Sequence, residues 1–370
     1  ARGHYMAAGK WEAAEVTTGR ISGYLRRRGH YGEIVRLNRE LLELNIPNSI
    51  QTGPAARIGQ AYLDQEDYKR AEKWYERALQ ISPEPASYLG LGLSLMHQEK
   101  FDLASSNLNK AYDAYRQAND LSRQMEALSS LAAIDMKKGE TKAALEKMES
   151  IAGIMRQLGD LPGEAQALQE TARLDMMLSN FDSARSRLQR SLELLQSSHD
   201  PRGAAFALFN LASLDLERGD FQAAAEEYAR ALPLFREMED RATVSAIRHS
   251  QGLIQAQAGE KELAISSFKE ALAINQDLGD KAAEAGSFFQ LGALAVLQDR
   301  MEVGLRLMAT AAVVLRSIKS DDVKNVEPLV ERLASQLNYS QEQFMVMVQE
   351  VLKGYSKDRG WGLVERASGK

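Results

Sequence analysis

The chain has 370 residues, enough to bury a sizeable core, and its formal net charge is −5 with a calculated pI of about 5.8. An acidic total charge does not favour a nucleic-acid-binding protein. The sequence contains no cysteine, which excludes disulfide scaffolds, thiolate zinc sites and a cysteine nucleophile in this chain, and which suits a reducing, cytoplasmic location. It also lacks the roughly 18 consecutive apolar residues of a membrane helix.

The N-terminal region, residues 1–51, predicts irregular helical repeats. Its opening, ARGHYMAAGKWEAAE, has neither an initial Met nor the apolar core of a signal peptide, so we expect a piece of a longer polypeptide. One amphipathic helix is predicted from about Gly9 to Arg28, and another from Tyr31 to about Leu44. Arginine is frequent here, either because it suits the negative ends of helices or because it docks onto an acidic neighbouring domain. These arginines are Arg20, Arg26, Arg27, Arg28, Arg36 and Arg39.

Residues 52–318 contain an internal repeat. A small marker residue recurs first after 33 residues and then five times after 40. Twelve residues after each marker stands another small residue, and sixteen after it a large apolar one, a spacing that places both on one face of an α-helix. Each unit therefore predicts two antiparallel helices. The seven markers are Gly59, Gly92, Ala132, Ala172, Ala212, Gly252 and Gly292.

Aspartates recur at two phases of this repeat. Those at the turns between units predict helix N-caps, because a carboxylate there accepts hydrogen bonds from the first free amides; they are Asp120, Asp160, Asp200, Asp240 and Asp280. A second series is Asp135, Asp175 and Asp215, three residues after the marker. These carboxylates either form a cation-binding strip or each bond to a local amide or arginine. We favour local bonding, because buried like charges need partners.

The segment IGQAYLDQEDYKRAEKWYERALQISP, from Ile58 to Pro83, resembles the consensus of the tetratricopeptide repeat (TPR). The matching positions are Gly59, Tyr62, Ala71, Tyr75, Ala78 and Pro83. The later units resemble the lengthened, 40-residue variety, although the second aspartate series replaces the consensus tyrosine. The resemblance implies an all-α fold, a right-handed α-solenoid of antiparallel helix pairs, with seven repeats over residues 52–318.

In this family the concave groove is lined by the first helix of each repeat. The resemblance therefore implies a partner-binding groove in the middle repeats, with several apolar side chains that would suit a peptide or helix. Each of them either faces the groove or turns inward to fill the core. The candidates are Arg173, Met176, Phe206, Phe209, Asn210, Ser213, His249, Leu253 and Phe289.

The C-terminal region follows the last repeat. Residues 319–354 predict two capping helices, about Asp322–Leu337 and Ser340–Lys353, the second starting with a capping box made by Ser340 and Gln343. A solenoid needs such helices because its last apolar face must be covered. Residues 355–370 are expected to form a disordered tail.

Catalytic patterns are not apparent. The five histidines are dispersed without metal-ligand spacing, and no phosphate loop or nucleophile elbow occurs. Gly90-Leu91-Gly92 lies inside a predicted repeat helix, where small residues serve packing. We therefore expect no enzyme activity, no cofactor and no metal site.

Two functional interpretations remain open. The chain resembles the TPR sensor arm of bacterial signal-transduction ATPases with numerous domains (STAND proteins), the class that includes the maltose-regulon activator. That resemblance implies ligand sensing in a cytoplasmic signalling protein, with an upstream NTPase domain in the same chain. The alternative is a stand-alone TPR scaffold that binds an extended or helical peptide. Neither interpretation involves nucleic acid or membrane, and neither fixes the oligomeric state.

Overall fold

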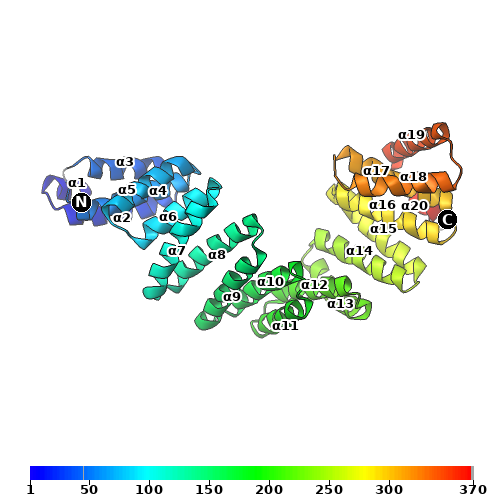
Figure 1. Ribbon diagram of the computed structural model, residues 1–370, viewed down its shortest axis with the longest axis horizontal. Helices are drawn as coiled ribbons and strands as arrows, with labels where there is room; N and C mark the ends of the chain where they lie inside the picture. Colours follow the sequence, from blue (N-terminus) through cyan, green and yellow to red (C-terminus); the bar gives the residue numbers. More distant parts are fainter. Residues whose placement is uncertain (45, 368–370) are drawn as a thin grey trace. The chain divides into compact units, whose positions relative to one another are not determined.

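The computed structural model describes residues 1–44 and 46–367, and every regular element in that part of the chain is a helix (Figure 1). The chain divides into two compact units, residues 1–187 and 188–370. The first unit contains α1 (Arg2–Ala7), α2 (Trp11–Arg26), α3 (Tyr31–Leu42), α4 (Asn48–Leu63), α5 (Tyr68–Ile81), α6 (Pro85–His97), α7 (Phe101–Gln117), α8 (Leu121–Lys138), α9 (Thr141–Leu158), α10 (Leu161–Met177) and the start of α11 (Phe181–Ser197).

The second unit contains the rest of α11 and the remaining helices. They are α12 (Pro201–Arg218), α13 (Phe221–Glu237), α14 (Arg241–Gln257), α15 (Lys261–Leu278), α16 (Lys281–Leu297), α17 (Met301–Ser317), α18 (Val323–Gln336), α19 (Gln341–Asp358) and α20 (Trp361–Ala367). The all-α solenoid of helix pairs predicted from the sequence is confirmed. The stretch predicted to hold the repeats forms consecutive helices from α4 to α17.

The turns of the repeat have the predicted chemistry. Asp120 caps α8 by accepting the Arg123 backbone N–H at 3.1 Å, and Asp200 caps α12 through Gly203 N–H at 2.9 Å. Asp160, Asp240 and Asp280 cap their helices in the same way. Within several repeats the first helix ends at a glycine in the left-handed conformation, such as Gly139 with φ of 77°. Glycine reaches that conformation without steric cost, so the chain can reverse within two or three residues.

The marker residues are small because the second helix of the repeat lies directly against them. The Tyr75 ring lies 3.1 Å from the position that a Cβ at Gly59 would occupy. At Gly92 the corresponding neighbour is Leu108, at 2.6 Å. The large apolar residue sixteen positions on therefore fills the space that the marker leaves, and both helices can approach closely.

The basic N-terminal segment forms α2 and α3, close to the predicted limits. Arg26 donates two hydrogen bonds to the Asp64 carboxylate, at 2.6 and 2.9 Å. Arg36 pairs with two glutamates of its own helix. Part of the arginine cluster is therefore matched by local carboxylates, whereas Arg27 and Arg28 are exposed.

The C-terminal helices cover the last repeat, and the capping box at Ser340 is present. The expectation of a disordered tail from residue 355 differs from the structure, because α19 continues to Asp358 and α20 follows. Val364 and Ala367 of α20 are buried in the core cluster of α15–α17. The Trp361 indole N–H donates to Gln276 at 2.8 Å. The sequence pattern of this short segment did not reveal the docking, which depends on apolar space between distant helices. Residues 368–370 lie outside the described part.

Candidate functional site

The candidate residues on the first helices of the repeats lie mostly in the second compact unit. We define the first-helix row as seven residues from three helices: Phe206, Phe209, Asn210 and Ser213 on α12, His249 and Leu253 on α14, and Phe289 on α16. All seven are half-buried. The row therefore belongs partly to the core and partly to the surface, between the two alternatives that the sequence left open.

The two phenylalanines of α12 rest on the aromatic core of the fifth repeat. Phe206 meets Phe235 edge to face, with ring centroids 5.0 Å apart. Phe209 lies 6.0 Å from Tyr228 and 6.1 Å from Phe235, also edge to face. This geometry is favourable for aromatic rings and fixes both side chains. The outer part of each ring is thus a rigid apolar surface.

The polar members of the row are held by neighbours. Ser213 shares a 3.0 Å hydrogen bond with the Tyr228 hydroxyl and donates to the Phe209 carbonyl at 2.9 Å. His249 of α14 meets the Phe268 ring at 5.2 Å, and burial lowers the pKa of its imidazole. The neutral form of His249 is therefore favoured, so at neutral pH the row carries no charge from this residue.

The apolar members Leu253 and Phe289 pack against the core cluster that includes Phe288. Each has a partly exposed side chain. Together with the phenylalanines of α12 they give the first helices of three successive repeats an apolar component. Relative to the marker of each repeat, Phe206 stands six residues before it, Phe209 and Phe289 three before it, and Leu253 one after it.

Two predicted site residues lie on α10, in the first compact unit. The Arg173 side chain is exposed and pairs with Glu170 at 3.1 Å. Met176 is half-buried. These two residues do not distinguish this part of α10 from an ordinary helix surface.

Two members of the second aspartate series pair with a cation inside their own repeat. Asp135 receives a hydrogen bond from Lys147 at 2.5 Å, and Asp175 forms an ion pair with Arg187 at 2.7 Å. Both cations stand twelve positions after their aspartate, on the second helix of the same pair. The favoured alternative, local pairing, is confirmed for these two residues, although the partner of Asp175 is not Arg173.

Asp215 differs from the other two, because the position twelve residues later is Glu227. Its carboxylate is fully buried. Among the described residues no group of three His, Asp or Glu side chains is arranged to hold a metal ion. Within the same part of the chain, no helix is both long and apolar enough to cross a membrane.

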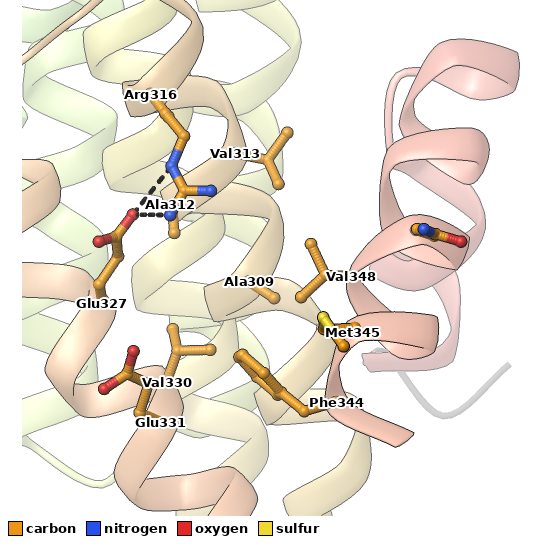
Figure 2. A pocket seen from close by; sticks show the side chains of 11 residues that line it. Ala309, Ala312, Val313, Arg316, Glu327, Val330, Glu331, Phe344, Met345 and Val348 are labelled. Atoms are coloured by element: carbon orange, nitrogen blue, oxygen red, sulfur yellow. Dashed lines mark hydrogen bonds and ion pairs between the residues drawn. The ribbon is translucent and has the colours of Figure 1, made fainter. Parts of the chain in front are cut away.

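A pocket that the sequence did not indicate lies at the C-terminal end. It has a volume of about 310 Å³ and lies between α17, α18 and α19 (Figure 2). Apolar side chains form most of its wall, with two glutamates and an arginine toward α18 and the end of α17. The signal available in the sequence was the run Phe344-Met345-Val346-Met347-Val348, which has more apolar residues than one face of α19 can bury.

Comparison with known families identifies the type of repeat in this chain. The tetratricopeptide repeat family model matches residues 165–237 and 203–277, and a second model of that repeat matches residues 56–85. The chain contains tetratricopeptide repeats. A model for anaphase-promoting complex subunit 5 matches residues 91–175 of this TPR chain. None of these models describes a catalytic family. No curated protein sequence matches the chain.

Several solved structures share the fold of the TPR chain. RapI in its apo form is similar with a TM-score of 0.67 and 14% identity, covering 93% of this chain and 99% of RapI. A STAND protein with a TPR sensor from Pyrococcus horikoshii has a TM-score of 0.57 and 17% identity; the match covers 76% of this chain and 44% of that protein. The C-terminal part of a TPR protein from Cytophaga hutchinsonii has a TM-score of 0.56 and 14% identity, with coverages of 70% and 95%.

Proposed function

We propose that this chain is a non-catalytic TPR module that binds a protein or peptide partner along its first-helix row. The observation that carries the proposal is the row itself: rigid, half-exposed aromatic and aliphatic side chains on the first helices of three successive repeats. Such side chains bind an apolar partner surface at little entropic cost, because their rotamers are already fixed. TPR solenoids commonly present their binding surfaces on repeated positions of this kind.

We propose further that the module is the C-terminal sensor arm of a larger STAND-type signalling protein, with an NTPase domain upstream in the same chain. The similarity to the STAND protein with a TPR sensor supports this assignment, since the match covers 76% of the present chain but only 44% of that protein. The remainder of such a protein would have to be encoded before residue 1.

A stand-alone TPR scaffold is the second candidate function. It is supported by the similarity to RapI, because the match covers 93% of this chain and 99% of that chain. The two candidates differ in the reading frame before Ala1. An NTPase domain there supports the sensor arm, whereas an initiation codon at or close to Ala1 leaves the scaffold.

Partner binding at the row can be tested by site-specific cross-linking. A photoreactive benzoylphenylalanine is introduced at Leu253, in the row, and in a matched protein at exposed Arg230 on the second helix α13. After irradiation in an extract of the native host, we expect a specific cross-linked product from position 253 and none from position 230. Equal cross-linking from both positions would contradict a binding surface on the first helices.

A further inference from the structure

The pocket at the C-terminal end lies outside the first-helix row and is independent of the proposed partner binding. We call it the C-terminal pocket and define it by Ala309, Ala312, Val313, Arg316, Glu327, Val330, Glu331, Phe344, Met345, Val348 and Gln349. In Figure 2 the helix of Ala309 and Val313 lies at the back, with α18 on one side and α19 on the other. Its volume of about 310 Å³ is close to the lower end of the range of small-molecule sites, roughly 300–1,000 Å³.

The pocket exists because α19 covers α17 incompletely. Only Met347 and Val351 of α19 are buried. Phe344, at the start of the helix, projects into the space between the helices, and Met345 is 55% exposed (Figure 2). Small residues on α17, Ala309 and Ala312, leave space at the back of the pocket, so apolar surface from three helices faces an open volume.

The charged groups of the pocket lie toward α18 and the end of α17, and they determine the net charge of its lining. The Arg316 guanidinium donates to one oxygen of Glu327 through two of its nitrogens, so its charge is matched within the protein. Glu331 follows Glu327 by one helical turn on α18 and is exposed. Its carboxylate has no ionic partner among the described residues. One arginine and two glutamates leave the lining with a net charge of −1.

We propose that the C-terminal pocket binds a small apolar molecule that carries a cationic amine. The apolar part would lie against Phe344, Val348 and the alanines of α17, and the ammonium group would pair with Glu331 at the α18 edge. An anionic ligand is disfavoured, because it would have to displace Glu327 from Arg316 and would approach the unpaired carboxylate of Glu331.

The test uses three probes of similar shape and different charge on the full chain: 3-phenylpropylammonium, 3-phenylpropanol and 3-phenylpropionate. Binding is followed by NMR of methionine methyl groups, where Met345 lines the pocket and Met347 lies on the other side of α19. We expect the Met345 signal to shift with a dissociation constant of about a millimolar for the cation, given the probe's size. An exposed ion pair should make the cation bind about threefold more tightly than the alcohol.

Two variants separate the charge from the cavity. Glu331→Gln should abolish the preference for the cation over the alcohol, whereas Glu342→Gln, on the other side of α19, should keep it. Val313→Trp, which fills the pocket, should remove binding of all three probes. The proposal is overturned if the Met345 signal does not respond to the cation, if the anion binds as tightly as the cation, or if Glu331→Gln leaves the preference intact.

Discussion

Gly90 and Tyr75 show how single residues set the distance between neighbouring repeats. A Cβ built on Gly90 of α6 would lie 2.1 Å from the Tyr75 ring of α5. Tyr75 is itself deeply buried, and this burial raises the pKa of its hydroxyl. The glycine is therefore required by packing, which agrees with the interpretation of the Gly90–Gly92 segment from the sequence. Gly23, in the interior of α2, provides a comparison, because a Cβ added there would have no neighbour within 4 Å.

Gly90→Ala should lower the free energy of unfolding by about 1–2 kcal/mol, because the overpacking cost exceeds the gain in helix propensity. Gly23→Ala should raise it by about 0.5–1 kcal/mol, since only the propensity gain applies. Urea denaturation of the two variants measures both effects. A stabilising Gly90→Ala would show that Tyr75 can move aside at no cost.

Phe206 tests how much the first-helix row contributes to the core. Since its ring packs on Phe235 but is only half-buried, Phe206→Ala should cost about 2 kcal/mol of stability, less than the 3–5 kcal/mol typical of a fully buried phenylalanine. Urea denaturation gives the value. A cost near zero would place the ring wholly on the surface.

His249 gives the second unit a pH dependence with a defined sign. Burial lowers its pKa in the folded state, so the unfolded chain binds a proton more readily. The stabilisation from the neutral imidazole is complete above the ordinary pKa of about 6.5 and is lost as the pH falls through the lower folded-state value. We expect His249→Gln to show a smaller loss of stability between pH 7.5 and 5.5 than the parent chain. An unchanged slope in parallel urea titrations would exclude His249 as the cause.

At the scale of the helix, α20 shows how a short segment is fixed by its surroundings. Seven residues are too few to form a stable helix alone. The segment is held by Val364 in the core of α15–α17, and by Gln276, whose side-chain amide donates to the Arg359 carbonyl at 2.9 Å. Arg300 also donates to the Ala367 carbonyl at 2.7 Å. These contacts make α20 part of the cap of the last repeat.

Ending the chain after Asp358 should therefore lower the stability of the second unit by about 3 kcal/mol, because it exposes apolar core and leaves polar partners unpaired. Val364→Asp should reproduce most of this loss, whereas Glu365→Asp, at an exposed neighbour, should change little. Thermal unfolding monitored by circular dichroism compares the three. If the shortened chain melts like the parent, α20 is not docked in solution.

At the scale of the whole molecule, the packing is dominated by neighbours along the chain. Within each compact unit, a helix contacts chiefly its neighbours along the chain, so a local perturbation should spread over one or two repeats only. The core clusters follow the same rule: the cluster around Tyr75 draws on α3 to α8, and the cluster around Phe288 on α14 to α20.

Hydrogen exchange measured by mass spectrometry tests this locality. In the Gly90→Ala variant, exchange should rise in peptides from α4 to α8 and stay unchanged in peptides from α14 to α17. Increased exchange throughout the chain would instead indicate one cooperative unit that includes all repeats.

The repeated helix pairs and their caps could be predicted from the sequence, because these depend on local features. Markers such as Gly59 are spaced by whole repeats, and caps such as Asp200 act within three residues of the chain. The all-α class and the seven pairs follow from these short-range relations. Even the partners of Asp135 and Asp175 are encoded at a fixed distance of twelve residues, although the sequence alone did not show which neighbour would be chosen.

The exposure of the candidate side chains and the helical structure at the C-terminal end could not be predicted from the sequence. The half-burial of Phe206 depends on the Phe235 ring of another helix. The docking of Val364 depends on three helices that precede it in the chain. The C-terminal pocket arises from incomplete contact between α17 and α19, two helices separated by α18. Such features depend on how well distant surfaces fit together, a property that periodicity along the chain does not record.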